Sequence, residues 1–333
     1  MSSRLPKKNF NLSDFFVGNR MTVREKEDFI PLFKTLEIDI KSKNDNNIAQ
    51  LMSNQTSRFR DLCMLYMIAI NDDEPFSYFM NIYTNYSDIH YDDDLFFCCA
   101  VNRKNYNKAI MLIDKGISAG TNDNFAINHI TNQDSSDRYG DNDNIIFLQK
   151  LIDRGANVNA DNGKPLGYAA KHNNFEYVEL LIKNGADPII NNNAAIRKLC
   201  SARNRYLDDD TRSLEYLINA GADPNANNGE PLKSCIYNEH FVKVLLDHGA
   251  TVDYLDPISL YKLITFANYN IVKLLQSHGV DFTIVNKFVL TVDTEYEKRL
   301  TDIEPLFELL GSTGVDFKLL SMNLMRTLLN GFA

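Results

Sequence analysis

The chain has 333 residues, of which 44% are apolar and 24% are charged, a balance typical of a folded protein with a sizeable core. Its net charge of −9 argues against general nucleic-acid binding, because Lys and Arg must displace counterions from phosphates. We find no apolar stretch long enough to span a bilayer and no secretory signal. The five cysteines form no C-x-x-C pair, which predicts free thiols in a reducing compartment. We therefore expect a soluble, intracellular, cytoplasmic protein.

Residues 1–60 carry no recognisable motif. The apolar residues of Asp28–Leu36 suit packing against a following pair of helices. We interpret residues 1–60 as an N-terminal cap, because the end of a helical array otherwise exposes its core. A small docking segment is the alternative.

A short motif recurs from about residue 62 to the C-terminus. Four copies share a Leu-Leu or Leu-Ile pair that is separated from Gly-Ala by two residues, and they lie at residues 151–159, 181–188, 217–225 and 245–253. Weaker copies lie at residues 112–116, 274–281 and 309–316, and Tyr86 replaces the glycine in a degenerate copy. The anchor positions are 86, 116, 155, 185, 221, 249, 279 and 314, spaced 28 to 39 residues apart. This periodicity predicts a repeat protein.

Each residue type in the motif has a physical role. The Leu pair is predicted to lie on the second helix of a repeat, and the glycine to end that helix in the left-handed conformation. The Asp or Asn that follows suits a turn, because its side chain bonds its own backbone. Upstream, the Gly-x-Pro-Leu sequences at residues 163–166 and 229–232 begin a shorter first helix, where the missing N–H of Pro costs nothing.

This pattern resembles the ankyrin repeat, whose period is about 33 residues. The resemblance is strongest over residues 144–281, and other helical repeats such as HEAT or tetratricopeptide do not explain the Gly-Ala-Asp turns. It implies an all-α fold, an ankyrin-repeat solenoid of about seven to eight helix-turn-helix units with capping segments at both ends. We place the repeats at residues 61–318 and a C-terminal cap helix at residues 319–333. The chain keeps the Pro-Leu of the family's Thr-Pro-Leu-His motif but has neither its Thr nor its His there.

Three stretches lengthen their repeats. Two are polar, at residues 131–144 and residues 204–210, and both are predicted to lie between the two helices of a repeat. The third, near residues 291–297, is predicted to be placed similarly. Insertions confined to one edge indicate a tolerated or functional face.

The chain offers no convincing catalytic or metal-binding constellation. His248 and His278 stand directly before a repeat glycine and have no partner with ligand spacing. The acidic loop at residues 134–143 fails the EF-hand register, since Ile146 falls where a liganding Glu is needed. Asp92–Asp94 is interpreted as solvated charge at a helix start. We therefore predict no enzyme activity, no cofactor and no metal.

The ankyrin resemblance implies a protein that binds another protein in a concave groove formed by the turns and the first helices. We predict an adaptor, inhibitor or scaffold, with Tyr as the foremost anchor because aromatic residues dominate interfaces. The candidate partner-binding residues are Asp161, Asn162, Lys164, Tyr168, Lys171, Asn192, Asn193, Lys198, Asn228, Glu230 and Ser234. We expect a monomer that binds neither nucleic acid nor membrane.

Two other functions stay open. The chain could be a structural component of a virus particle or another assembly, or an enzyme whose catalytic part lies in residues 1–60 or in the insertions. The Asn-rich turns, including the run at residues 191–193, resemble ankyrin proteins of large DNA viruses, particularly the giant amoebal ones. That likeness implies a host protein as the partner and the host cytoplasm as the location. Similar composition also occurs in AT-rich protists and intracellular bacteria.

Overall fold

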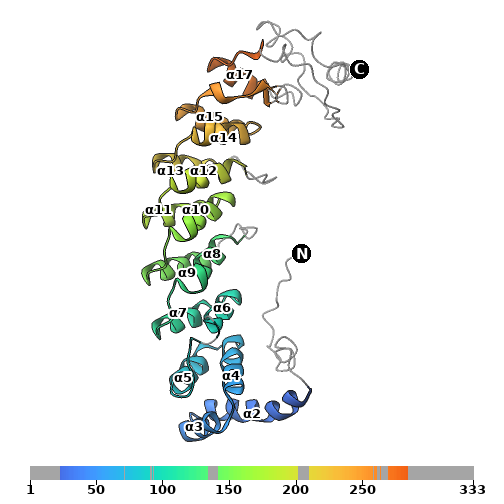
Figure 1. Cartoon of the computed structure of the whole chain (residues 1–333), viewed down its shortest axis with the longest axis vertical. Coiled ribbons are helices and arrows are strands. Elements are labelled where there is room, and N and C mark those ends of the chain that lie inside the picture. The colour runs from blue at the N-terminus through green and yellow to red at the C-terminus, as the bar shows by residue number, and fades with distance from the viewer. Residues whose placement is uncertain are drawn as a thin grey trace. The chain divides into compact units, whose positions relative to one another are not determined.

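Helices are the only regular secondary structure in the described part of the chain. The computed structural model describes residues 23–70, 72–90, 92, 94–133, 142–201, 210–257, 259–260, 263 and 269–283. These residues form fifteen α-helices and one 3-10 helix, with no strand among them (Figure 1). The predicted all-α repeat fold is confirmed.

The chain divides into two compact units. The N-terminal unit comprises Met1–Ile130 and Tyr139–Asn157, and the C-terminal unit comprises Thr131–Arg138 and Val158–Ala333. The helices up to residue 153 are α2 (Val23–Lys41), α3 (Asp45–Asn54), α4 (Ser57–Ala69), α5 (Asp73–Tyr83), α6 (Leu95–Asn102), α7 (Tyr106–Asp114), α8 (Thr121–Thr131) and α9 (Asn142–Asp153). From α4 onward they alternate as first and second helices of successive pairs.

The C-terminal unit continues the same alternation. Its helices are α10 (Ala160–Lys171), α11 (Phe175–Lys183), α12 (Ile190–Ser201), α13 (Arg212–Asn219), α14 (Ala226–Ser234), α15 (Glu239–Asp247), η1 (Val252–Tyr254) and α17 (Tyr269–Ser277). The described residues thus contain six complete pairs from α4 to α15, and α17 is the second helix of a further repeat. The motif copy at residues 309–316 and the predicted cap helix at residues 319–333 lie outside the described residues.

The second helices end as the motif predicts. The first Leu of each strong copy is fully buried, at Leu151, Leu181, Leu217 and Leu245. The glycine that follows adopts a positive φ each time, for example +89° at Gly185. Tyr86, in the degenerate copy, is not among the left-handed residues, and α5 ends instead with a bond from the Ser87 N–H to the Tyr83 carbonyl. Where tyrosine replaces the repeat glycine, the helix therefore ends in a different turn.

Each first helix from α8 to α14 contains an unusual turn near its start. Three successive residues adopt the left-handed conformation in what we call the turn tips, which are residues 122–124, 161–163, 191–193 and 227–229. Asn, Asp and Gly occupy all of these positions, and they are the residues that reach this conformation at least cost. The Asn-rich sequence of the turns therefore has a local backbone cause.

Helices α2 and α3 pack against the first helix pair of the N-terminal unit. Phe33 is fully buried, and its ring centroid lies 5.4 Å from those of both Phe59 and Tyr66 on α4. The predicted packing of Asp28–Leu36 is thus confirmed. The division of the chain at residue 60 stays a prediction, and α4 begins three residues before it, at Ser57.

The carbonyls at the end of α4 accept hydrogen bonds from side chains of α7 and of the turn before it. The Lys108 ammonium is buried and donates to the carbonyl of Met67 at 2.8 Å and to that of Ile70. Asn105 donates its side-chain N–H to the carbonyl of Ile68 at 2.5 Å. Burial lowers the pKa of Lys108 to about 8, while the charges of Asp73 and Asp72 oppose that shift. These contacts pair carbonyls that the helix itself leaves without partners.

Both insertions lie between the two helices of a repeat, as predicted. The first separates α8 from α9, and the second separates α12 from α13. The first is shorter than expected, because residues 142–144 already belong to α9. Residues 134–141 and 202–209 lie outside the described residues, as does the third predicted insertion near residues 291–297.

The turn tips give a direct test of backbone strain. Asn192 is exposed and has a φ of +53°, so replacing it changes little but the backbone preference. We expect Asn192→Ala to lower the free energy of unfolding by about 1 kcal/mol, since Cβ crowding disfavours the left-handed region for alanine. Asn192→Gly should be neutral or stabilising. Urea unfolding followed by circular dichroism measures both, and equal stability of the two variants would contradict the strain argument.

Lys108 gives a second test. Lys108→Met keeps an apolar chain of similar length but leaves the last carbonyls of α4 without their donor. We expect a loss of about 2 to 3 kcal/mol in the free energy of unfolding, because buried acceptors without partners are costly. The exposed Lys243→Met on α15 serves as the control and should stay within about 0.5 kcal/mol of the native chain. A small effect at both positions would show that the carbonyls find other donors.

Candidate functional site

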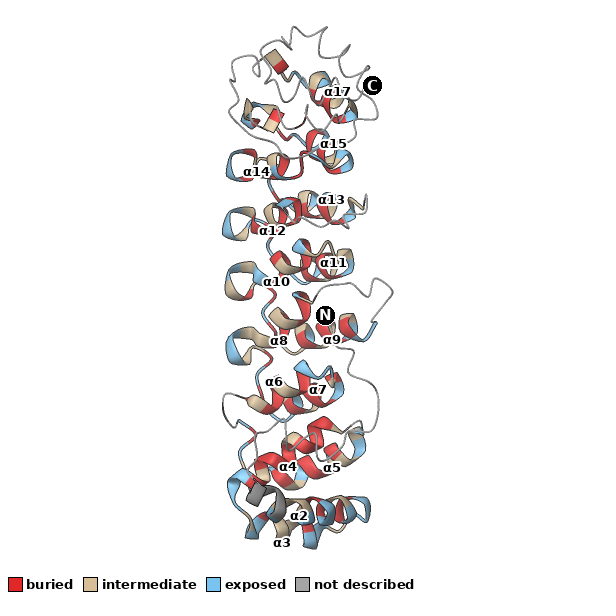
Figure 2. Cartoon of the chain, turned by 90° about the vertical axis from the view of Figure 1, so that its right-hand side faces the viewer, coloured by how far each residue is buried: buried red, intermediate tan, exposed pale blue. Residues whose placement is uncertain are grey.

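The first helices of the C-terminal unit form one continuous surface. Helices α10, α12 and α14 lie next to one another, and their turn tips project on the same side with exposed residues (Figure 2). We call the outward side chains of these three helices and their turn tips the first-helix face. All eleven predicted partner-binding residues belong to it. Five lie in turn tips, namely Asp161, Asn162, Asn192, Asn193 and Asn228, and six lie on the helices, namely Lys164, Tyr168, Lys171, Lys198, Glu230 and Ser234.

Tyr168 and Lys198 contact each other across two repeats. The Lys198 ammonium lies 5.2 Å from the centroid of the Tyr168 ring, which is within the range of a cation–π interaction. Its side chain also covers Gly167, where an added Cβ would come within 2.9 Å of Nζ. Burial, together with the charges of Lys171 and Lys164, lowers the pKa of Lys198. The absence of a side chain at residue 167 therefore leaves the space in which Lys198 reaches the tyrosine ring.

Glu230 is engaged within the fold. Its carboxylate accepts from the Arg197 guanidinium at 2.6 Å and from the Asn227 side-chain amide at 2.5 Å. The bond from Arg197 lowers the pKa of Glu230 most strongly. Both charged side chains are about 30% exposed, at 27% and 30%, so the pair stabilises the fold by roughly 1 kcal/mol or less. Glu230 thus helps to join α12 to α14.

Asparagine side chains connect the successive turns. Asn159 donates to the carbonyl of Gly185 at 3.0 Å and accepts from the Asp187 N–H at 2.9 Å. Asn225 repeats this geometry with Gly249 and Thr251 at 2.8 Å each.

The turn between these two uses a different residue. There Ile189 stands where the bridging Asn would be, and Asn193 of the turn tip accepts from the Asp223 N–H at 2.8 Å. Asn193 therefore has a role inside the fold. Its binding to a partner, like that of the other predicted residues, stays a prediction.

The histidines before the repeat glycines cap helices. Nδ1 of His248 lies 2.8 Å from the carbonyl of Val244, and Nδ1 of His278 lies 2.9 Å from that of Leu274. Asn184 makes the equivalent bond to the carbonyl of Leu180 at 2.8 Å. These side chains satisfy carbonyls in the last helical turn, which explains their place in the repeat.

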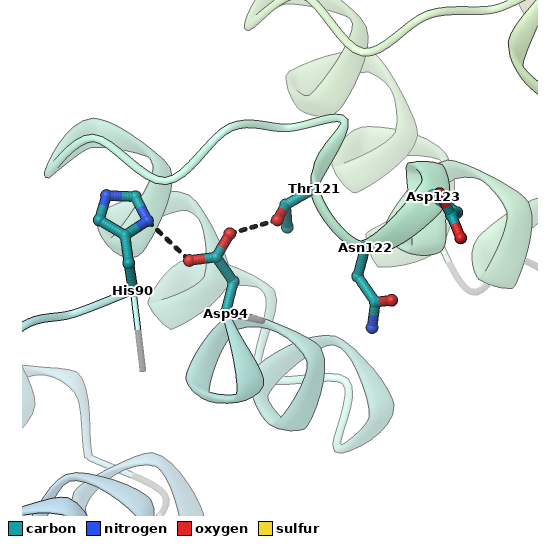
Figure 3. A pocket seen from close by; sticks show the side chains of 5 residues that line it. All are labelled: His90, Asp94, Thr121, Asn122 and Asp123. Atoms are coloured by element: carbon teal, nitrogen blue, oxygen red, sulfur yellow. Dashed lines mark hydrogen bonds and ion pairs between the residues drawn. The ribbon is translucent and has the colours of Figure 1, made fainter. Parts of the chain in front are cut away.

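A pocket in the N-terminal unit brings together residues that sequence analysis did not connect. His90, Asp94, Thr121, Asn122 and Asp123 line a cavity of about 460 Å³ (Figure 3). His90 Nδ1 lies 2.7 Å from one Asp94 oxygen, and the Thr121 hydroxyl donates to the other.

The interpretation of Asp94 as a solvated charge was wrong, because only 7% of it is exposed. It precedes α6 in the left-handed conformation, and the two donors from 4 and 27 residues away replace its hydration. The contact between Asp94 and Thr121 was not predicted from the sequence because it depends on how two repeats stack.

In this pocket the Asp94 carboxylate is contacted on one oxygen by the His90 imidazole and on the other by the Thr121 hydroxyl, so both groups serve to pair a buried carboxylate. Across the described ranges, no group of three or more His, Cys, Asp or Glu side chains is arranged to hold a metal ion. The described helices also include none with the length and apolar character to cross a bilayer.

Comparison with known proteins assigns this geometry to a family. A family model described as an ankyrin repeat matches residues 161–190, from the first turn tip of the C-terminal unit to the start of α12. A protein of Acanthamoeba polyphaga mimivirus, named as an ankyrin repeat protein, is 31% identical over 249 residues, which cover 72% of this chain and 76% of the relative. The chain belongs to the ankyrin-repeat proteins.

Other relatives of this ankyrin-repeat protein have the same description. A second mimivirus protein is 26% identical over 238 residues, covering 69% of this chain and 63% of the relative. A protein of Rickettsia bellii is 48% identical over 52 residues, covering 15% of this chain and 31% of the relative. The chain spans 63% and 55% of the length of two of its mimivirus relatives. The predicted likeness to ankyrin proteins of giant DNA viruses is confirmed.

The bridging asparagines provide a test of how the ankyrin repeats are joined. Asn225→Ala removes two hydrogen bonds to the following turn, and its φ of −99° adds no strain for alanine. We expect the free energy of unfolding to fall by about 1 to 2 kcal/mol. Asn219→Ala, at the exposed end of α13, is the control and should be neutral within about 0.5 kcal/mol. If chemical denaturation gives the same change in the free energy of unfolding for Asn225→Ala and Asn219→Ala, the bridge contributes nothing beyond helix propensity.

Proposed function

We propose that this protein is an adaptor, inhibitor or scaffold that binds a partner protein through the first-helix face of its C-terminal unit. Ankyrin repeats are protein–protein interaction modules and are typically not enzymes. The proposal adds to that general role a specific surface, with Tyr168 and Lys198 at its centre. A protein of a host cell, with the host cytoplasm as the location, fits the viral relatives.

One observation carries the choice of surface. Equivalent positions that face the core keep their character from repeat to repeat, and Leu166, Ile196 and Leu232 are all at most 2% exposed. Two residues further along each helix, Tyr168, Lys198 and Ser234 are all at least partly exposed and differ completely. The fold constrains the first set and leaves the second set free to be selected for recognition.

The contact between Tyr168 and Lys198 also favours this surface. An aromatic ring held in place by a neighbouring side chain loses little conformational entropy on binding. Tyrosine supplies apolar area together with a polar tip, which is why it is enriched at the energetic centres of interfaces. The pair therefore offers a partly ordered anchor before any partner arrives.

The test is co-purification of the tagged full chain from its natural cell type, with partners identified by mass spectrometry. The bait variant carries Tyr168→Ala, Lys171→Ala and Lys198→Ala. A matched control carries Tyr216→Ala, Lys183→Ala and Lys243→Ala, which removes one Tyr and two Lys from the second helices of the same unit. Circular dichroism and urea midpoints establish that each bait is folded.

We expect a specific partner to be retained by the native chain and the control and to fall at least about tenfold with the first-helix variant, since central interface residues carry most of the binding energy. A partner retained by all three baits would move the site to another surface. If no partner is recovered and the protein is abundant in purified virus particles, the result would instead favour a structural role in the particle.

A further inference from the structure

Charge is distributed unevenly between the two helix layers of the C-terminal unit. The first helices α10, α12 and α14 carry five Lys or Arg and two Asp or Glu. The second helices α11, α13 and α15 carry three Lys or Arg and five Asp or Glu. The chain as a whole has a net charge of −9, so the basic layer runs against the overall composition.

The basic residues of the first helices concentrate around Tyr168. Lys164 and Lys171 are exposed on the same helix as the tyrosine, and Lys198 lies over its ring. Lys164 and Lys171 stand four residues before and three residues after Tyr168, so the three side chains share one face of α10. Burial, followed by the charges of Lys171 and Lys164, lowers the pKa of Lys198. Asp161 offsets part of this charge through its contact with Lys164 at 3.3 Å. An excess of positive charge remains around one aromatic ring.

Like charges held together cost free energy in the unbound protein, and an anionic group placed among them relieves that cost. A ring flanked by lysines suits a ligand that presents an apolar side chain between carboxylates. The other two basic side chains of the face are Arg197, which is paired with Glu230, and Lys233, which donates to the Asn228 carbonyl at 2.9 Å. Three of the five basic side chains of the face therefore gather around Tyr168, and this is the region that suits acidic groups.

We infer that the partner contacts this surface through an acidic peptide segment, rich in Asp or Glu with an apolar or aromatic residue among them, bound by Lys164, Lys171 and Lys198 around Tyr168. This inference rests on the proposed function and adds the chemistry of the partner to it. Nucleic acid is the less favoured polyanion, because the surrounding second helices are acidic and the chain is anionic as a whole. A short acidic segment avoids that repulsion, since it needs only the local cluster.

The experiment starts from an unbiased choice of ligand. A phage-displayed library of random peptides of about 16 residues is selected against the immobilised full chain at low salt. Enriched sequences are synthesised with a fluorescent label, and their affinities are measured by fluorescence anisotropy at about 50 and 300 mM salt. A labelled single-stranded RNA of the same length is measured in parallel.

Charge reversal at two lysines tests the site. One variant carries Lys164→Glu and Lys171→Glu, and the matched control carries Lys183→Glu and Lys243→Glu, with the same change in net charge. Lys171 and Lys183 both lie in the last turn of their helices, so their substitutions perturb the helix ends alike. Circular dichroism confirms that both variants are folded before binding is measured.

We expect the enriched peptides to be acidic, to bind at least about tenfold more weakly to the Lys164→Glu, Lys171→Glu variant, and to change less than about twofold with the control. Enriched peptides without acidic excess, whose binding is lost in Tyr168→Ala, would overturn the inference while leaving the proposed function intact. Acidic peptides that bind both charge variants equally would overturn the assignment of the lysines. Tighter binding of the RNA than of any peptide would replace the acidic peptide with nucleic acid. Failure to enrich any peptide would overturn the inference, and co-purification would then decide the proposed function separately.

Discussion

The left-handed turn tip is the constraint on which the repeats from α8 to α15 depend. Three successive residues with positive φ interrupt the helical backbone near the start of each first helix there, so only Asn, Asp and Gly are tolerated at low cost. Once this turn is fixed, the Leu and Ala positions of the following helix face the core. The residues two positions beyond Leu166 and its equivalents then face outward. The backbone requirement at the tip thus determines which side chains are available for recognition.

Polar side chains that bridge repeats supply hydrogen bonds and an ion pair in addition to the apolar contacts between helices. Lys108 donates to carbonyls at the end of a helix in the preceding repeat. Asn159 and Asn225 join successive turns, and Arg197 pairs with Glu230. Each of these groups satisfies a backbone or charged partner in a neighbouring repeat, so the interaction is lost if either repeat is disordered. Stability in such arrays is therefore a property of neighbouring pairs.

Much of the fold follows from local sequence. The helix pairs, the buried Leu and the positive φ of the repeat glycines were predicted because they depend on residues close together in the chain. The contact of Asp94 with Thr121 and that of Glu230 with Arg197 were not predicted, since these partners lie 27 and 33 residues away and depend on the stacking register. The Asn run at residues 191–193 was interpreted as a sign of origin. The structure adds a conformational reason for the same residues, since all three adopt the left-handed conformation, and the two explanations are compatible.

The bridging asparagines have a consequence for how such a chain can gain or lose repeats. Asn159 and Asn225 make the same pair of bonds to the turn that follows, so these two joints are chemically equivalent. The joint between them is made by Asn193 from a turn tip, with Ile189 in the usual place. Duplication or deletion in phase with the equivalent joints preserves every bridge. A recombination that separates Asn193 from the Asp223 turn leaves an N–H without its acceptor, and this chemistry restricts where the array can be spliced.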